Sequence, residues 1–349
     1  MTMTETWESL FKERALDEGR SEEFIAQCIE YAGKLHEKNL PVIFDFVHLA
    51  YYLGFYSEKL QGIVANVEGH YRTYHIRKKT GGTRVIEAPD AMLKDVQHWI
   101  YGNILCRDKS INDCVHGFVP ALTEADKVRG ILSNAAPHSG HDWLINLDLK
   151  DFFHTVKLDM VKAYFDSLGY EEEVSKTLTA LCTMKSRLPQ GAPTSPMLSN
   201  LIATKMDEEM MAYCGERGIT YTRYADDLTF SANYDVEMPL VKELYAIIFR
   251  NGFIVNRQKT KIRFPGYKKE VTGLTVTNGV HVPKKYRKEV WRELYFCKKF
   301  GVYEHYHQMG TDKGLYKAWL RGRIMFIRQI DPACGNKMLE KFNELNWLV

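Results

Sequence analysis

The feature that most limits the folds open to this chain is a pair of adjacent aspartates between two short β-prone runs. The runs cover residues 219–224 and 228–231, and only Ala225-Asp226-Asp227 separates them. A connection this short joins antiparallel strands in a hairpin, so both carboxylates are expected at its turn. A third aspartate, Asp148, directly follows a short apolar strand predicted at 143–147. The sequence therefore predicts a sheet that carries carboxylates at strand ends and turns.

Carboxylates in this arrangement suit a divalent metal ion. Mg²⁺ prefers oxygen ligands and keeps part of its shell for water and substrate phosphates, which an exposed strand edge allows. Two such ions, about 4 Å apart, can catalyse phosphoryl transfer. Asp148 is the predicted bridging ligand, Asp226 the second ligand and Asp227 a looser one. Aspartates are also common in turns for local hydrogen-bonding reasons, so the dipeptide alone leaves a purely structural role open.

The rest of the pattern indicates a mixed α/β chain. Alternating residues on both sides of Thr80-Gly81-Gly82 predict a β-hairpin over 70–89. Ser195, followed by Pro196, predicts a helix start with Ser195 as the N-cap, and this helix is expected to end near Cys214. Further helices are predicted over 5–65, 91–105, 123–132, 158–168, 172–183, 240–250 and from 283 onward, and further β-prone runs at 253–255 and 271–276.

Charge is divided unevenly along the chain, although the net charge is only +3. Residues 257–349 hold 20 lysines and arginines against 8 acidic residues, whereas residues 1–256 hold 27 against 36. A basic C-terminal module on an acidic body favours the binding of a polyanion, and a solvated basic face is the alternative. The seven cysteines lack zinc spacing, and no apolar run suits a membrane span or signal peptide. A cytoplasmic protein without membrane contact is expected.

Five segments, in chain order, resemble the motifs of reverse transcriptases. They are 77–86 (RKKTGGTRVI), 147–153 (LDLKDFF), 188–196 (LPQGAPTSP), 224–227 (YADD) and 251–260 (NGFIVNRQKT). The resemblance covers about residues 70–280 and implies an RNA-directed DNA polymerase, a nucleotidyltransferase. It also implies an α/β (α+β) fold of the right-hand polymerase type. Its parts would be a helical N-terminal region (1–69), fingers and palm (70–280) and a helical, basic thumb (281–349).

The resemblance assigns roles to single residues. Asp148, Asp226 and Asp227 would be the catalytic residues and, with the neighbouring Leu149, would form the site for two Mg²⁺ ions. Phe153 would stack beneath the sugar of the incoming nucleotide and exclude a 2′-hydroxyl, so that the product is DNA. The predicted contacts to the incoming dNTP come from four of the five segments: Arg77, Arg84, Asp151, Phe152, Phe153, Gln190 and Lys259.

Two further segments resemble motifs of the retron group of reverse transcriptases. Residues 134–138 (NAAPH) are similar to its Asn-Ala-x-x-His motif, and residues 271–273 (VTG) to its Val-Thr-Gly motif. Taken alone, the first segment also fits a helix cap and a satisfied polar residue, and the second a strand with a turn-prone end. The resemblance predicts RNA contacts from both segments: Asn134, His138, Val271, Thr272 and Gly273.

A retron enzyme would use a folded non-coding RNA from the adjacent locus as primer and template. Synthesis would start at the 2′-hydroxyl of an internal guanosine and give branched RNA–DNA (msDNA), in an antiviral defence system that also contains an effector protein. The helical thumb leaves no room for a nuclease domain, so a separate RNase H is expected to remove template RNA. Two alternatives stay open: another bacterial reverse transcriptase, of the group II intron or diversity-generating type, and an RNA-binding scaffold for an effector.

The start of the predicted thumb mixes basic and aromatic residues at helical spacing. Its cations are expected to contact RNA phosphates, while Val290, Trp291 and Leu294 pack inward. The predicted RNA-binding cations are Lys284, Lys285, Arg287, Lys288, Arg292, Arg321 and Arg323.

Overall fold

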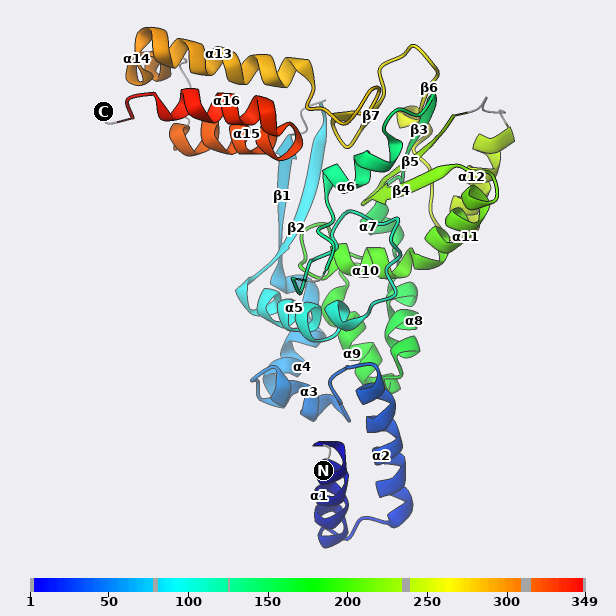
Figure 1. Cartoon of the computed structure of the whole chain (residues 1–349). Helices are drawn as coiled ribbons and strands as arrows, with labels where there is room; N and C mark the ends of the chain where they lie inside the picture. The colour runs from blue at the N-terminus through cyan, green and yellow to red at the C-terminus, as the bar shows by residue number, and fades with distance from the viewer. Residues whose placement is uncertain (1–2, 78–80, 125, 234–238, 309–314, 348–349) are drawn as a thin grey trace.

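The computed structural model describes residues 3–77, 81–124, 126–233, 239–308 and 315–347. This part of the chain combines helices with three antiparallel sheets (Figure 1), and the predicted mixed α/β class is confirmed. Lys78, Lys79 and Thr80, at the tip of the predicted hairpin, lie outside the described residues. No helix of the described part is long and apolar enough to cross a membrane.

The N-terminal region is helical, as predicted. It contains α1 (Met3–Asp17), α2 (Glu22–Glu37), α3 (Phe46–Tyr52) and α4 (Ser57–Ala65). The side chains of Ser21 and Asp45 cap α2 and α3 by accepting hydrogen bonds from the Phe24 and His48 amides. Buried residues of α2, α3 and α4 belong to the same apolar core as the central sheet. Figure 1 shows α1 and α2 at the end of the molecule opposite the C-terminal helices.

A two-stranded hairpin follows, formed by β1 (Tyr71–Arg77) and β2 (Thr83–Pro89). Its base is fixed to the loop over 188–196, because the Glu87 amide donates a 2.8 Å hydrogen bond to the Gln190 carbonyl. The Glu87 carboxylate also accepts two hydrogen bonds from Arg187, at 2.9 and 3.0 Å. Helix α5 (Ala91–Asn103) comes next, capped by Asp90, which accepts from the Leu93 amide. These contacts join the hairpin firmly to the body.

The central sheet has the strand order β4 (Thr220–Tyr224), β5 (Asp227–Ala232), β3 (Trp143–Asp148), β6 (Lys261–Arg263), and all neighbours are antiparallel. The inner strand β3 is almost completely buried, as its apolar sequence requires. Helices that contribute to the same core are α7 (Phe152–Thr155), α8 (Leu158–Leu168), α9 (Glu172–Cys182), α10 (Ser195–Ile202), α11 (Thr204–Gly215) and α12 (Pro239–Arg250).

A second apolar core lies under the C-terminal helices α13 (Lys284–Phe300), α14 (Val302–Gln308), α15 (Tyr316–Ile330) and α16 (Pro332–Asn343). It also includes residues of α6 (Ile131–Ala135) and of the small hairpin β7 (Glu270–Val271) and β8 (Leu274–Thr275). Leu144 of β3 belongs to this cluster, which therefore reaches the central sheet. The predicted boundary between palm and thumb at residue 280 stays a prediction. Val271 and Leu274 precede that boundary, yet they pack with the C-terminal helices.

Several predicted elements differ from the structure. Residues 123–124 and 126–130 are not helical, because the Asp126 carboxylate accepts from the Leu122 and Thr123 amides and closes a turn. Thr194, not Ser195, holds the N-cap position of α10, and Ala203 separates α10 from α11. Residues 253–255 form only an isolated bridge, between Val255 and Leu149, and 271–276 is a hairpin instead of one strand.

Candidate active site

The three carboxylates come together at one end of the central sheet. The strand register places Asp148 directly opposite Asp227, and such partners project to the same face. Ala225 and Asp226 form the two-residue turn between β4 and β5, with Ala225 at φ 57°. The Leu149 amide donates a 2.8 Å hydrogen bond to the Asp226 carbonyl. The turn is therefore tied to the end of β3, and two segments distant in sequence present their acids together.

The surroundings of these acids disfavour negative charge. Burial, together with the charges of Asp226 and Asp148, raises the pKa of Asp227 to about 6. Burial and the charge of Asp148 also raise the pKa of Asp226. An opposing charge comes from Lys259, whose Nζ lies 2.7 Å from Asp148 Oδ2. The site is thus a group of crowded acids with one ammonium in direct contact.

A divalent cation fits this donor set. Among the described residues, no three histidine, cysteine, aspartate or glutamate side chains already form a metal cage. Two carboxylates nevertheless share one face, a third lies in the adjoining turn, and burial together with their mutual repulsion raises the pKa values of Asp226 and Asp227. A cation would relieve that repulsion, and oxygen donors favour Mg²⁺ over metals that take cysteine or histidine. Leu149 is buried beside these acids.

Arg223, which the sequence analysis missed, supports the catalytic turn from inside the protein. Its guanidinium is fully buried and donates to the Asp207 carboxylate through Nε and Nη2, at 2.5 to 3.1 Å. Nη1 donates to Asn200 Oδ1 at 2.8 Å and to the Ala225 carbonyl at 3.2 Å. The available sequence signal was only an arginine in a β-prone run just before the acids, which reveals neither burial nor partner.

A second support is the segment 114–118, which runs along the outer edge of β4. The Arg223 amide donates to the Cys114 carbonyl and the His116 amide donates to the Arg223 carbonyl, both at 2.8 Å. Gly117 lies so close to the turn that a Cβ there would be 2.6 Å from the Ala225 nitrogen. A larger residue at 117 would therefore displace the turn that carries Asp226.

Three residues predicted to contact a nucleotide follow strand β3, and they differ in how far they are buried. Phe153 is half-buried on α7, and Asp151, at φ 50°, is exposed directly before that helix. Phe152 is buried, and its ring packs 5.6 Å from that of Phe253. The Phe152 ring is therefore part of the core, and a nucleotide contact at this position stays a prediction.

The other predicted nucleotide contacts come from the hairpin and from later segments. Lys259 is in contact with Asp148, and the charge of Arg84, exposed on β2, acts on the Asp226 carboxyl. Gln190 is half-buried in the loop that its carbonyl ties to β2. Arg77 is exposed at the end of β1, opposite Thr83. The structure thus brings Lys259 and Arg84 into the electrostatic range of the carboxylates.

Comparison with known proteins decides the family. Residues 76–285 match the family model described as reverse transcriptase (RNA-dependent DNA polymerase). The Retron Ec86 reverse transcriptase of Escherichia coli is 33% identical over 318 residues, which cover 89% of this chain and 92% of that protein. The chain belongs to the retron reverse transcriptases. It is an RNA-directed DNA polymerase with the right-hand fold of that family, as the motifs predicted, and such enzymes depend on divalent metal.

Two further retron enzymes agree with this assignment. The Retron Ec83 reverse transcriptase of Escherichia coli is 31% identical over 79% of this chain and 88% of that protein. The Retron Mx65 reverse transcriptase of Myxococcus xanthus is 31% identical over 78% of this chain, which spans 64% of that longer protein. A solved telomerase from Candida albicans, in complex with a fragment of telomeric RNA, aligns over 82% of this chain and 67% of its own, at 10% identity and a TM-score of 0.44.

In this retron reverse transcriptase, Asn134 and His138 lie inside the protein. His138 is fully buried, with Nδ1 2.6 Å from Ser231 Oγ and Nε2 2.8 Å from Thr222 Oγ1. Asn134 is also fully buried, and its carbonyl accepts from the Thr222 hydroxyl. Neither side chain reaches the surface in this structure, and the predicted RNA contacts of Asn134 and His138 stay predictions. His138 ties the neighbouring strands β4 and β5 together.

The Val-Thr-Gly motif forms the turn of the β7–β8 hairpin. Val271 is fully buried in the C-terminal core, and its predicted RNA contact stays a prediction as well. The Thr272 hydroxyl donates to the Ile131 carbonyl, and Gly273 has φ 81°, a conformation that suits glycine. Gly273 is the exposed member of the motif. The motif thus links the hairpin to α6, the helix that also contains Asn134.

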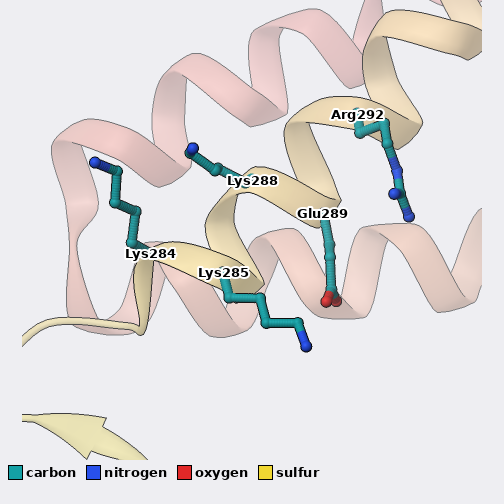
Figure 2. A pocket seen from close by; sticks show the side chains of 5 residues that line it. All are labelled: Lys284, Lys285, Lys288, Glu289 and Arg292. Atoms are coloured by element: carbon teal, nitrogen blue, oxygen red, sulfur yellow. The ribbon is translucent and has the colours of Figure 1, made fainter.

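The predicted RNA-binding cations of the thumb fall into two groups. Lys284, Lys285, Lys288 and Arg292 line a groove along α13 together with Glu289. Figure 2 shows Lys284 and Lys288 on one side of the helix, and Lys285 with Glu289 on the other.

In the second group, Arg323 and Arg287 are held by other side chains of the thumb. Arg323 donates to Glu289 Oε2 at 2.8 Å and lies 4.3 Å from the centre of the Tyr286 ring, while Arg287 reaches Asp331. Arg321 is exposed on α15. Val290 and Leu294 are buried as predicted, but Trp291 is 37% exposed, so its inward packing was wrong.

Proposed function

We propose that this enzyme copies a cognate structured non-coding RNA into DNA from the 2′-hydroxyl of an internal guanosine. The product is a branched RNA–DNA molecule (msDNA), formed within a retron system of defence against phage. The proposal is supported by family membership and by the motifs at 134–138 and 271–273. Its further partners are dNTPs, a separate RNase H and an effector protein, and its location is the cytoplasm.

The observation that carries the catalytic proposal is the register that sets Asp148 opposite Asp227, beside Asp226. These carboxylates would hold two Mg²⁺ ions, which supply charge neutralisation at the phosphates and acidify the attacking hydroxyl. Asp148 and Asp226 are the firmer ligands. Asp227 has a pKa near 6, so part of the molecules carry a proton on this carboxyl at slightly acidic pH. That proton must be lost before the carboxylate can bind a metal ion.

The chain's own cations and rings position the substrates. Lys259 and Arg84 bind the triphosphate, with Arg77 and Gln190 closing over the nucleotide from the hairpin and its adjoining loop. Phe153 lies beneath the sugar and excludes a 2′-hydroxyl by contact. Most of the rate enhancement then comes from positioning and charge compensation, which is the general pattern of phosphoryl transfer.

The thumb holds the template RNA through its sugar–phosphate backbone. Lys284, Lys285, Lys288 and Arg292 are exposed on α13, and their charges are not cancelled by Glu289, which pairs with Arg323. Exposed lysines and arginines along a helix bind phosphates without reading the sequence. Arg287 and Arg321 extend this basic surface, whereas Arg323 contributes by holding Glu289 aside.

The nucleic acid bound to the enzyme tests the proposal. Protein expressed together with its flanking locus is purified, and the bound nucleic acid is digested with ribonuclease, deoxyribonuclease or both. We expect a hybrid that neither enzyme digests completely, with DNA joined to RNA through a 2′–5′ branch. The Asp226→Asn/Asp227→Asn variant serves as control and should carry RNA alone. DNA with a free 5′ end in the unaltered enzyme would contradict priming from a guanosine 2′-hydroxyl.

A further inference from the structure

Phe118 lies beside the ring that the proposed function places under the nucleotide sugar. Its ring centre is 6.0 Å from that of Phe153, at an interplanar angle of 41°. The residue is 42% exposed and has φ 61°, a left-handed conformation that is uncommon for a bulky side chain. Local preference alone therefore disfavours this geometry, and contacts elsewhere in the loop must hold it.

Those contacts come from the catalytic hairpin itself. Directly before Phe118, the His116 amide donates to the Arg223 carbonyl, and the Gly117 carbonyl accepts a 2.8 Å hydrogen bond from Asn200 Nδ2. Gly117 also packs against the backbone of the turn at Ala225. The position of Phe118 is thus set by the same strand and turn that carry Asp226 and Asp227.

The ring of Phe153 has two aromatic neighbours. One is Phe152, 5.8 Å away between ring centres, which is anchored in the core by Phe253. The other is Phe118, 6.0 Å away. Phe153 itself stands on α7, a helix of only four residues that follows a residue in the left-handed conformation. A helix this short does not fix a ring by itself, so its neighbours determine how far the ring can recede.

We propose that Phe118 is a positioning residue that holds Phe153 in place and thereby sets the selection of dNTPs over rNTPs. The inference rests on the proposed role of Phe153. Exclusion of a 2′-hydroxyl is a steric effect, so it requires a ring that cannot move aside. The Phe118 ring packs against that ring, and its loop is bonded to the strand and turn that lead to the carboxylates. Removal of the Phe118 ring lets Phe153 recede and admits ribonucleotides.

The test compares dGTP with GTP as substrates of the full-length enzyme on an RNA template annealed to a DNA primer. The measured quantity is the ratio of kcat/KM for the two nucleotides. We expect Phe118→Ala to lower the preference for dGTP about tenfold, mainly through faster use of GTP. Phe118→Gly should act in the same way, and because it relieves the backbone strain at φ 61°, it separates loss of the ring from strain at this position. Phe118→Tyr should keep the preference.

Two further variants separate the possible failures. Phe249→Ala removes a phenylalanine that is 76% exposed on α12 and should leave the ratio unchanged. Phe153→Ala should lower the preference at least as much as Phe118→Ala. If Phe153→Ala lowers it and the Phe118 variants do not, Phe118 has no positioning role. Slower use of both nucleotides at an unchanged ratio in the Phe118 variants would also overturn the inference. An unchanged ratio in Phe153→Ala would instead overturn the proposed role of Phe153 itself.

Discussion

Lys259 Nζ lies 2.7 Å from Asp148 Oδ2, so the lysine that follows α12 contacts the carboxylate that ends β3. The Lys259 side chain is 59% exposed, whereas that of Asp148 is 9% exposed. The acid is therefore fixed in the sheet, and the lysine is free to swing away from it. A bound cation at Asp148 would compete with this contact and release the ammonium toward the substrate phosphates.

This arrangement predicts a specific defect for Lys259→Ala. The lysine of this half-buried ion pair is mostly exposed, so its loss costs little folding free energy and the urea midpoint should stay close to that of the unaltered enzyme. The KM for dNTPs in primer extension should rise about tenfold, because one charge-assisted contact to the triphosphate is lost. Lys268→Ala removes a comparable exposed lysine that pairs with Glu270, and it should change neither quantity. An unchanged KM in Lys259→Ala would show that this lysine does not bind the triphosphate.

The buried pair of Arg223 and Asp207 predicts a defect in stability. Asp207→Asn leaves the fully buried guanidinium without its counter-charge, and the free energy of unfolding should fall by about 3 to 5 kcal/mol. Urea denaturation followed by circular dichroism measures this change. The surface variant Glu30→Gln, which breaks the exposed Glu30–Lys34 pair, should leave the urea midpoint unchanged. Equal midpoints for the two variants would contradict the structural role of Arg223.

The burial of His138 predicts that the protein is sensitive to acid. Burial, with smaller effects from the charges of His141 and His116, lowers the pKa of His138 to about 3. The unfolded chain, with a pKa near 6.5 at this residue, therefore binds the proton first as the pH falls. The stabilisation is complete above about pH 6.5 and is lost as the pH falls toward 3, by about 1.4 kcal/mol per pH unit.

Urea denaturation at pH 7, 6 and 5 measures this dependence. His138→Gln should show a shallower fall in the free energy of unfolding over this range than the unaltered enzyme. Some slope should remain, because burial also lowers the pKa of His116, to about 4. Identical slopes would mean that His138 is not held in its neutral form by the fold.

The sequence was sufficient for the elements whose signals are local. The helix over 158–168 follows from periodicity alone, and the turn at Ala225-Asp226 follows from its short connection. The register that sets Asp148 opposite Asp227 is not local, because it depends on the pairing of strands distant in sequence. The place of Asp148 beside Asp226 and Asp227 was predicted from the resemblance to reverse transcriptases.

Burial was the property that the sequence did not reveal. Asn134, His138 and Phe152 were predicted as ligand contacts, yet each packs inside, because motif residues can serve the fold as well as the ligand. Arg223 shows the opposite error, since a charged residue was not expected in the core. Its burial depends on Asp207 and on other partners brought together only by the tertiary structure. The same holds for Phe118, whose neighbour Phe153 lies on a separate segment.

The most direct test of the central claim is primer extension on an RNA template with dNTPs and Mg²⁺, comparing Asp148→Asn and Asp226→Asn with Asp142→Asn. Asp142 is an exposed aspartate directly before β3, so its variant changes the same chemical group outside the site. We predict that Asp148→Asn and Asp226→Asn each reduce DNA synthesis by about a thousandfold or more, with unchanged folding, and that Asp142→Asn retains full synthesis. Undiminished synthesis by Asp148→Asn or Asp226→Asn would contradict the assignment of these carboxylates as the catalytic centre.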